Sequence, residues 1–178
     1  MSVTITGTGV SQGIAIGNVH RLEWGEVEVH EAAIPKDLVE GEVARFHSAV
    51  RAARQQLKAI RNGIPADTPA DITDFIDTHL LMLEDSLLIA APVELIRRNL
   101  CNAEWALKSQ RDALAQVFDQ MDDPYLRTRK DDVLHIVKRI HSCLAGKKQT
   151  KDGHLYRGKI IVADDLTPAD TIMMQHEK

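Results

Sequence analysis

Histidines are the residues of this chain best suited to bind a metal ion or to carry a transferable group, and the chain has eight of them. His135 and His141 are six positions apart, so they do not form the i, i+4 pair of a helical zinc site. The sequence contains no HExxH motif, no cluster of cysteine with histidine and no glycine-rich phosphate loop. We therefore predict surface or half-buried positions for most of these histidines, and no metal site.

A second candidate for chemistry is the junction at 160–170. Ile160–Val162 is a short apolar run that is typical of a buried strand. Thr167 stands at the N-cap position of a following helix, with Pro168 at its first position and Asp170 in its first turn. Strands that run into capped helices are places where α/β proteins build sites. Because the sequence ends at Lys178, about two turns later, we expect this α/β unit to be incomplete.

A third candidate is the acidic, apolar segment 75–85. Successive residues of a helix are rotated by about 100°, so one helix cannot hide all of 80–83. We expect Leu81 and Met82 to face outward in part. Seven acidic residues and no Lys or Arg lie between Gly63 and Ile96. This pattern predicts a docking surface for a basic partner. A neighbouring helix that covers the apolar residues, or a merely solvated acidic face, explains the pattern equally well.

Long helices must position these residues, because apolar residues recur at helical spacing from 39 to 144. The first stripe runs from Val39 to Ile60 at alternating spacings of four and three. A second helix follows Pro69, with an apolar side that continues to Leu87. Pro92 marks a break or the first turn of a short helix, and two more long helices begin after Asn102 and after Asp123.

The ends of the chain have a different pattern, which is typical of strands. The segments 3–5, 13–20 and 26–30 are β-branched, glycine-punctuated or alternating. We therefore predict an α+β fold, mostly α, in which a four-helix hairpin-type bundle at 34–147 is inserted in an α/β domain made of 1–33 and 148–178.

Composition excludes several classes of function. The net charge is −4, with 44% apolar and 27% charged residues, which argues against nucleic-acid binding. No apolar run approaches the roughly 18–20 residues that span a bilayer, so we expect no membrane contact. Cys101 and Cys143 are far apart and form no CxxC motif, which indicates reduced thiols and a cytoplasmic protein.

Four segments resemble one family, in order and across nearly the whole chain. Residues 11–17 resemble the SxGIAxG opening of Enzyme I, the phosphoenolpyruvate–protein phosphotransferase of the bacterial sugar phosphotransferase system. Residues 79–85 are similar to its HxxxLxD segment, and 125–139 to its YLxxRxxDVxDIxxR helix. Residues 163–171 are similar to its AxDLTPSxT junction. Each motif alone is weak, but the four together are specific.

The resemblance implies a function. Enzyme I moves a phosphoryl group from phosphoenolpyruvate to a histidine and then to the carrier HPr, and its helical insert docks HPr. The acceptor histidine of the family lies in a GGxxSHxAI motif beyond the position of Lys178. The resemblance therefore implies a partial phosphohistidine domain and an N-terminal fragment that docks HPr but is inactive alone. The parent enzyme is implied to be a homodimer with a C-terminal domain that binds phosphoenolpyruvate and Mg²⁺, whereas the fragment needs no cofactor.

The resemblance also implies roles for particular residues. Thr167 and Asp132 match positions near the missing histidine, where a hydroxyl could hydrogen-bond the resting imidazole. The residues implied to bind the partner are Asp71, Asp74, Phe75, Thr78, His79, Leu81, Met82, Asp85, Phe118, Leu126 and Arg129.

Three other functions fit parts of the sequence. The chain could be a non-enzymatic helical adaptor whose acidic helix binds an unrelated basic partner. It could belong to the nitrogen-branch paralogue of Enzyme I, which would serve a different HPr-like carrier. A swivelling phosphohistidine domain of a dikinase relative is a weaker alternative, because of the Leu-Met helix and the length of the insert.

Overall fold

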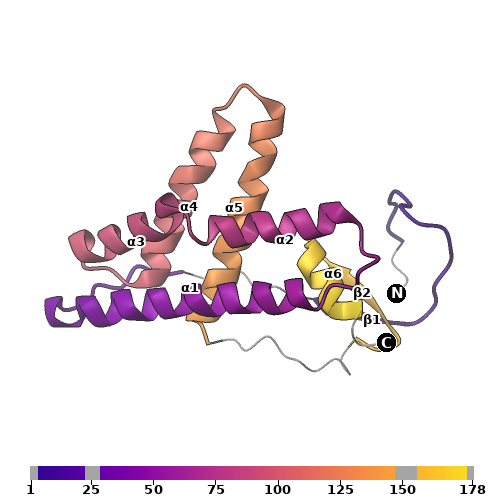
Figure 1. The fold of residues 1–178 in the computed structure, drawn as a ribbon, viewed down its shortest axis with the longest axis horizontal. Coiled ribbons are helices and arrows are strands. Elements are labelled where there is room, and N and C mark those ends of the chain that lie inside the picture. The colour runs from indigo at the N-terminus through magenta and orange to yellow at the C-terminus, as the bar shows by residue number, and fades with distance from the viewer. Residues whose placement is uncertain (1–3, 23–28, 147–155, 176–178) are drawn as a thin grey trace.

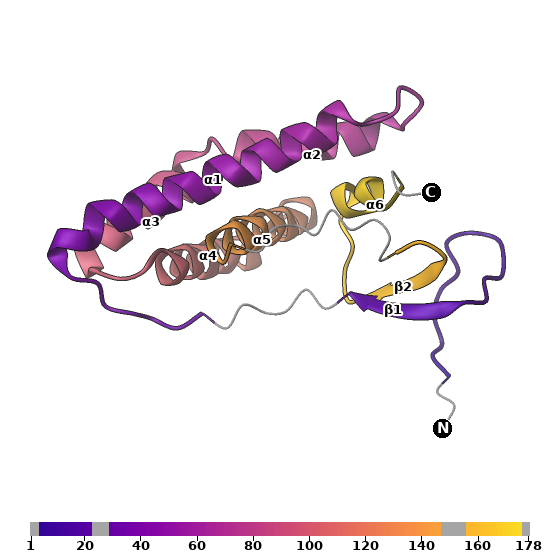
Figure 2. The ribbon, with the colours of Figure 1, turned by 90° about the horizontal axis from the view of Figure 1, so that it is seen from below.

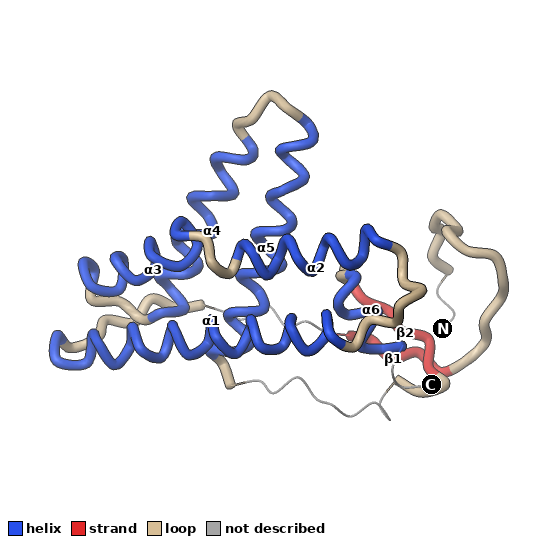
Figure 3. Tube along the Cα trace, in the orientation of Figure 1, coloured by secondary structure: helices blue, strands red, loops and turns tan. Residues whose placement is uncertain are grey.

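The computed structural model describes residues 4–22, 29–146 and 156–175. Along the chain the elements are β1 (Asn18–Leu22), the 3-10 helix η1 (Lys36–Leu38), α1 (Val39–Asn62), α2 (Ala70–Met82), α3 (Ser86–Asn99), α4 (Ala103–Asp119), α5 (Pro124–Leu144), β2 (Lys159–Ala163) and α6 (Pro168–Gln175). Figure 1 shows α5 crossing the long α1 helix and the tip of the α4–α5 hairpin projecting beyond α2. Figure 2 shows α1, α2 and α3 in one layer and α4 with α5 in another. The fold is mostly helical with a small parallel strand pair, as predicted (Figure 3).

The core lies between these two helical layers and is built on the apolar side of α1. Every apolar residue of the predicted stripe from Val39 to Ile60 is buried, and Phe46 and Leu57 are completely so. The side chains of α3, α4 and α5 that meet this stripe include Ile96, Leu107 and Ile136. Complete burial of one large apolar side chain is worth about 1.5–3 kcal/mol, so the stripe contributes much of the stability of the packed helices.

The second predicted helix is divided in two, and the prediction that its apolar side continues to Leu87 is wrong. Helix α2 ends at Met82, and α3 begins at Ser86, with Leu87 exposed. The break occurs because Asp85 acts as an N-cap: its carboxylate accepts a hydrogen bond from the N–H of Leu87 at 2.7 Å. Pro92 lies inside α3 rather than at its start. The helical part of the described residues between η1 and β2 therefore has five helices, α1 to α5, and not four.

Ion pairs and a cap fasten α4 to α1. Oε1 of Glu42 accepts a hydrogen bond from the N–H of Ala103 at 2.7 Å, at the N-terminus of α4. Arg45 pairs with Glu42 at 2.7 Å and with Glu104 at 2.6 Å. These bonds hold the pKa of the Glu42 carboxyl below its usual value, and the bond to Arg45 is the largest cause. Glu42 therefore connects the two layers as an anion.

The strand pair joins the two ends of the described chain. Strands β1 and β2 run parallel, with Val19 opposite Ile160 and Arg21 opposite Val162. Each strand has a partner on one side only within the described residues, so both strands keep an open edge. The pairing is compatible with the predicted α/β domain of 1–33 and 148–178, but that division of the chain stays a prediction.

Most of the N-terminal strand prediction is wrong. Within 4–17 the structure has no strand, and Ile14 and Ile16 are 95% and 98% exposed. Both described strands keep an open edge, but residues 4–17 do not pair with either of them. Of the segments predicted as strands, residues 3 and 26–28 lie outside the described part of the chain, and residues 29 and 30 are not in a strand.

Two expectations from composition can be compared with the structure. None of the helices formed by the described residues is long and apolar enough to cross a bilayer. Cys101 and Cys143 are free thiols; the first is buried and the second is half-buried.

Candidate functional site

His79 lies on α2 and is buried, with 3% of its side chain exposed. It shares a face with Ile76 and Leu83, at the i, i+3 and i+4 spacings that bring side chains together on a helix. The ring packs on Phe75 with 4.0 Å between ring centroids. The expectation that His79 belongs to an outward docking face is therefore wrong, because this face of α2 turns toward the core.

Burial also sets the charge of His79. Desolvation lowers the pKa of the imidazole to about 4, and the nearby Asp132 opposes part of this effect. His79 is therefore neutral at pH 7, with a ring nitrogen that carries a lone pair.

Asp132 lies on α5 and points one carboxylate oxygen at α2. Its Oδ1 is 3.5 Å from Nε2 of His79, and its Oδ2 accepts a hydrogen bond from Nη1 of Arg129 at 2.9 Å. The Arg129 guanidinium also donates to the hydroxyl of Tyr125 and stacks over its ring at 5.0 Å. Arg129 is thus held within α5, one turn before Asp132, and orients the carboxylate.

His135 connects α5 to the junction between β2 and α6. Its Nε2 is 2.7 Å from Oδ2 of Asp165, the last acidic residue before the helix. This bond holds the pKa of the Asp165 carboxyl below its usual value. Nδ1 of the same ring is buried and has no hydrogen-bond partner among the described residues. His135 also lies near His79, with 6.2 Å between ring centroids.

Thr167 forms the cap of α6, as predicted. Its backbone N–H and its hydroxyl both donate to Oδ2 of Asp170, at 3.0 and 2.6 Å, and the N–H of Asp170 lies 3.3 Å from the hydroxyl oxygen. This is a reciprocal capping box, built with aspartate. The hydroxyl proton is therefore committed to Asp170, so the Thr167 hydroxyl can accept a further hydrogen bond but cannot donate one. Behind it, Asp170 is buried beside the guanidinium of Arg139.

The other predicted docking residues have different exposures. Leu81 is 69% exposed, as expected for an outward residue. The three predicted acids, Asp71, Asp74 and Asp85, are exposed. The remaining described candidates are half-buried: Phe75, Thr78, Met82, Phe118 and Arg129. The side chain of Leu126 lies outside the described part of the structure. On α3, α4 and α5, the exposed large apolar residues that the sequence analysis missed are Leu87 at 60%, Val117 and Tyr125.

The α2–α3 break explains why Leu87 was missed. A single continuous helix would turn Leu87 toward the same side as Leu80 and Leu83. Because a new helix begins after Asp85, the side chain of Leu87 points in a different direction. Leu81 and Leu87 then lie on either side of the break as exposed apolar side chains. The signal for this was the Asp85-Ser86 pair, which is typical of a helix N-terminus.

The acidic field of α2 is partly neutralised from α1. Arg61 pairs with Asp77 at 2.8 Å, and Arg54 pairs with Glu84. Asp71 and Asp74 make no ion pair with another described residue and are exposed. Asp71 and Asp74 thus present exposed negative charge at the first turns of α2, and Arg61 attracts Asp74 from a longer distance.

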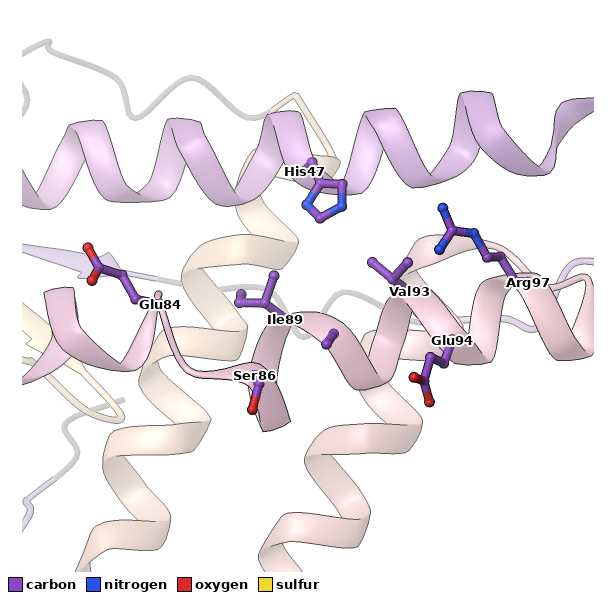
Figure 4. Close-up of a pocket in the computed structure, with 8 residues that line it drawn as sticks. His47, Glu84, Ser86, Ile89, Val93, Glu94 and Arg97 are labelled. Atoms are coloured by element: carbon purple, nitrogen blue, oxygen red, sulfur yellow. The ribbon is translucent and has the colours of Figure 1, made fainter.

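A hollow of about 350 Å³ lies between α1 and α3, lined in part by His47, Ile89, Val93 and Arg97. Figure 4 shows His47 on α1 facing Ile89 and Val93 on α3. None of its lining residues belongs to the group formed by His79, Asp132 and His135. The hollow and the histidine group are therefore separate features.

The family described as PEP-utilising enzyme, N-terminal, matches residues 6–129, which is well over half of the chain. The chain belongs to this family. Among curated relatives, the phosphoenolpyruvate-protein phosphotransferase of Cupriavidus necator is 36% identical over 99% of the chain and 32% of the relative. That of Bacillus subtilis is 33% identical over 97% of the chain and 30% of the relative. The chain thus spans about a third of the length of these relatives.

Solved structures of related domains have the same fold. The solution structure of an Enzyme I protein, nEIt, superposes with a TM-score of 0.72 and 26% identity, over 84% of this chain and 60% of that one. The N-terminal domain of the nitrogen Enzyme I superposes with a TM-score of 0.67 and 22% identity, over 91% and 65% of the two chains, which supports the fold. The family assignment and these matches confirm the resemblance to the N-terminal region of Enzyme I.

Proposed function

We propose that this chain is the part of a phosphoenolpyruvate–protein phosphotransferase that docks an HPr-type phosphocarrier. The relatives that it matches are named phosphoenolpyruvate-protein phosphotransferase, and the chain covers 32% and 30% of their length. In the proposal, the remainder of such a protein supplies the acceptor histidine, the domain that binds phosphoenolpyruvate with Mg²⁺, and the dimer contacts. The protein works in the cytoplasm and contacts neither membrane nor nucleic acid.

One observation carries this proposal: two exposed leucines flank the α2–α3 break beside an acidic helix. Leu81 and Leu87 are both more than half exposed, and exposed apolar residues with a polar rim are typical of interaction sites. Asp71 and Asp74 provide an acidic approach to this surface, which would steer a basic partner. The partner would cover the leucines, and the acids would set its rate of arrival. His79 lies beneath this surface and supports α2 from within.

Titration of the chain with HPr, followed by NMR of the labelled amides, tests the proposal. Shifts are expected at 71–87 and near 117–129. Leu81→Ser should weaken binding about tenfold or more, because the lost contact of a buried leucine is worth about 1.5–3 kcal/mol. Leu38→Ser removes an equally apolar, exposed residue from η1 and should leave the affinity unchanged. Equal losses for both variants would refute this surface.

The same titration separates the alternatives. If HPr produces no shifts at millimolar concentration, the helical adaptor with another basic partner becomes the better explanation. Tighter binding of a nitrogen-branch carrier than of HPr would assign the chain to that branch. Phosphoenolpyruvate should label none of its histidines, because none stands in a GGxxSHxAI context; a phosphorylated histidine in the 178-residue chain would overturn that prediction.

A further inference from the structure

Three groups that bind metal ions come together between α2 and α5. His79, Asp132 and His135 each offer a ligand atom, and these atoms all lie within 4.8 Å of one another. Asp132 and His135 are three residues apart on α5, a spacing that places both side chains on one face of the helix. His79 approaches this face from α2.

The distance between His79 and Asp132 fits a shared ion better than a direct hydrogen bond. Nε2 and Oδ1 are 3.5 Å apart, whereas an N–H···O hydrogen bond is normally about 2.7–3.2 Å long. Zinc bonds of about 2.0–2.2 Å at tetrahedral angles place two ligand atoms about 3.4 Å apart. The two atoms therefore already have the separation that a tetrahedral ion requires.

His135 has the surroundings of a metal-binding imidazole. Its Nε2 is hydrogen-bonded to Asp165, so the neutral ring carries its lone pair on Nδ1, the buried nitrogen that has no partner among the described residues. Histidines that bind metals usually bond the ion through one nitrogen and donate to a carboxylate or carbonyl from the other. Asp165 provides that carboxylate.

Asp132 is held in a comparable way. Arg129 binds Oδ2 and leaves Oδ1 directed at His79. In the helix motif YLxxRxxDVxDIxxR, the position of His135 is the second aspartate, so the imidazole distinguishes this chain from the motif. Its replacement of a carboxylate changes the donor set to two nitrogens and one oxygen, which favours zinc over magnesium or calcium.

We propose that His79, Asp132 and His135 bind one Zn²⁺ ion, with water as the fourth ligand, and that Arg129 and Asp165 orient the ligands. The ion would fasten α2 to α5, and through Asp165 it would fasten both helices to the junction between β2 and α6. This inference goes beyond carrier docking and replaces the expectation, drawn from the histidine spacing alone, that the chain has no metal site.

Calorimetric titration of the chelator-treated, full 178-residue chain with Zn²⁺ tests the proposal, and Co²⁺ supplies a spectroscopic readout of four-coordinate geometry. We expect one ion per chain. His135→Gln should weaken zinc binding about 100-fold or more, and Asp165→Asn about 10- to 100-fold, because it removes only the orienting carboxylate. His47→Gln, a half-buried histidine on α1, is the matched control and should bind as the wild type does.

Circular dichroism of each variant checks that it is folded, and His135→Gln is the preferred ligand variant because His79 is more deeply buried. The absence of saturable one-to-one binding would overturn the proposal. It would also be overturned if His135→Gln bound zinc as tightly as the wild type, or if His47→Gln lost as much affinity. The HPr titration is run in chelator, so failure of carrier docking and failure of zinc binding remain distinguishable.

Discussion

Replacement of His141 by leucine should remove part of the acid sensitivity of this fold. His141 is buried on α5, and neither of its ring nitrogens has a hydrogen-bond partner among the described residues. Desolvation lowers its pKa to about 4, while Glu104 opposes the shift and Arg111 adds to it. The unfolded chain would protonate the same residue near pH 6.5. Between these values the unfolded state binds more protons, so the free energy of unfolding decreases as the pH falls.

The magnitude follows from the two pKa values. One pKa unit corresponds to about 1.4 kcal/mol, and little of the effect is present above pH 7. For a folded pKa of about 4, acidification from pH 7.5 to 5.5 should lower the free energy of unfolding by about 1.3 kcal/mol through His141 alone. Other groups add their own dependence, so the difference between variants is the quantity to measure.

Urea unfolding followed by circular dichroism, at pH 7.5 and 5.5 with chelator present, measures this difference. His141→Leu should lose about 1.3 kcal/mol less on acidification than the wild type. At pH 7.5 it should be as stable as the wild type or more so, because it removes two unpaired buried nitrogens. Ile140→Val, at the adjacent buried position, should lose about 0.5–1.5 kcal/mol at both pH values and keep the wild-type pH dependence. An unchanged pH dependence in His141→Leu would refute the reasoning.

Three further predictions concern stability, and urea unfolding at pH 7.5 measures all of them. Glu42→Gln should cost about 1–3 kcal/mol, because the cap on α4 and the charge-assisted bond to Arg45 are both weakened; a neutral result would show that water replaces them. Phe46→Ala should cost about 3–5 kcal/mol, because the completely buried ring leaves a cavity in the α1 stripe. A loss below 1 kcal/mol would mean that the layers collapse onto the gap. Asp123→Ala should cost about 0.5–2 kcal/mol through loss of the N-cap bond to Tyr125 of α5, whereas Asp122→Ala, one residue earlier, should change little.

The long helices were predictable because the sequence patterns that indicate them are local and repeated. The stripe from Val39 to Ile60 follows helical spacing over six turns, and all of its apolar members are buried. Caps also gave correct starts, as at Asp123 and Thr167. The α2–α3 break was missed because the apolar spacing continues through it to Leu87, and only the side chain of Asp85 decides that a new helix begins.

The histidine group could not be predicted from spacing along one helix. Spacing along α5 suggests only His141 as a companion for His135, whereas the actual neighbours of His135 are Asp132, three residues earlier, and His79 on another helix. The packing of α2 against α5 is a tertiary contact, which a local sequence pattern does not predict. The Asp-x-x-His spacing at 132–135 was the one sequence signal available. The prediction of N-terminal strands was wrong for a similar reason. An apolar, β-branched segment forms a strand only if another strand pairs with it, and that pairing is not visible in the local sequence.

The parallel pairing of β1 with β2 has a consequence for the order in which the chain folds. A parallel pair cannot form through a tight turn, and here the connection between the strands contains all of the helices from α1 to α5. The entropy of closing so long a connection is repaid only after the helices have shortened it by packing. We therefore expect the strand pair to form last and to open first. Amide hydrogens of Val19 and Ile160 should then exchange with solvent well before those at the centre of α1.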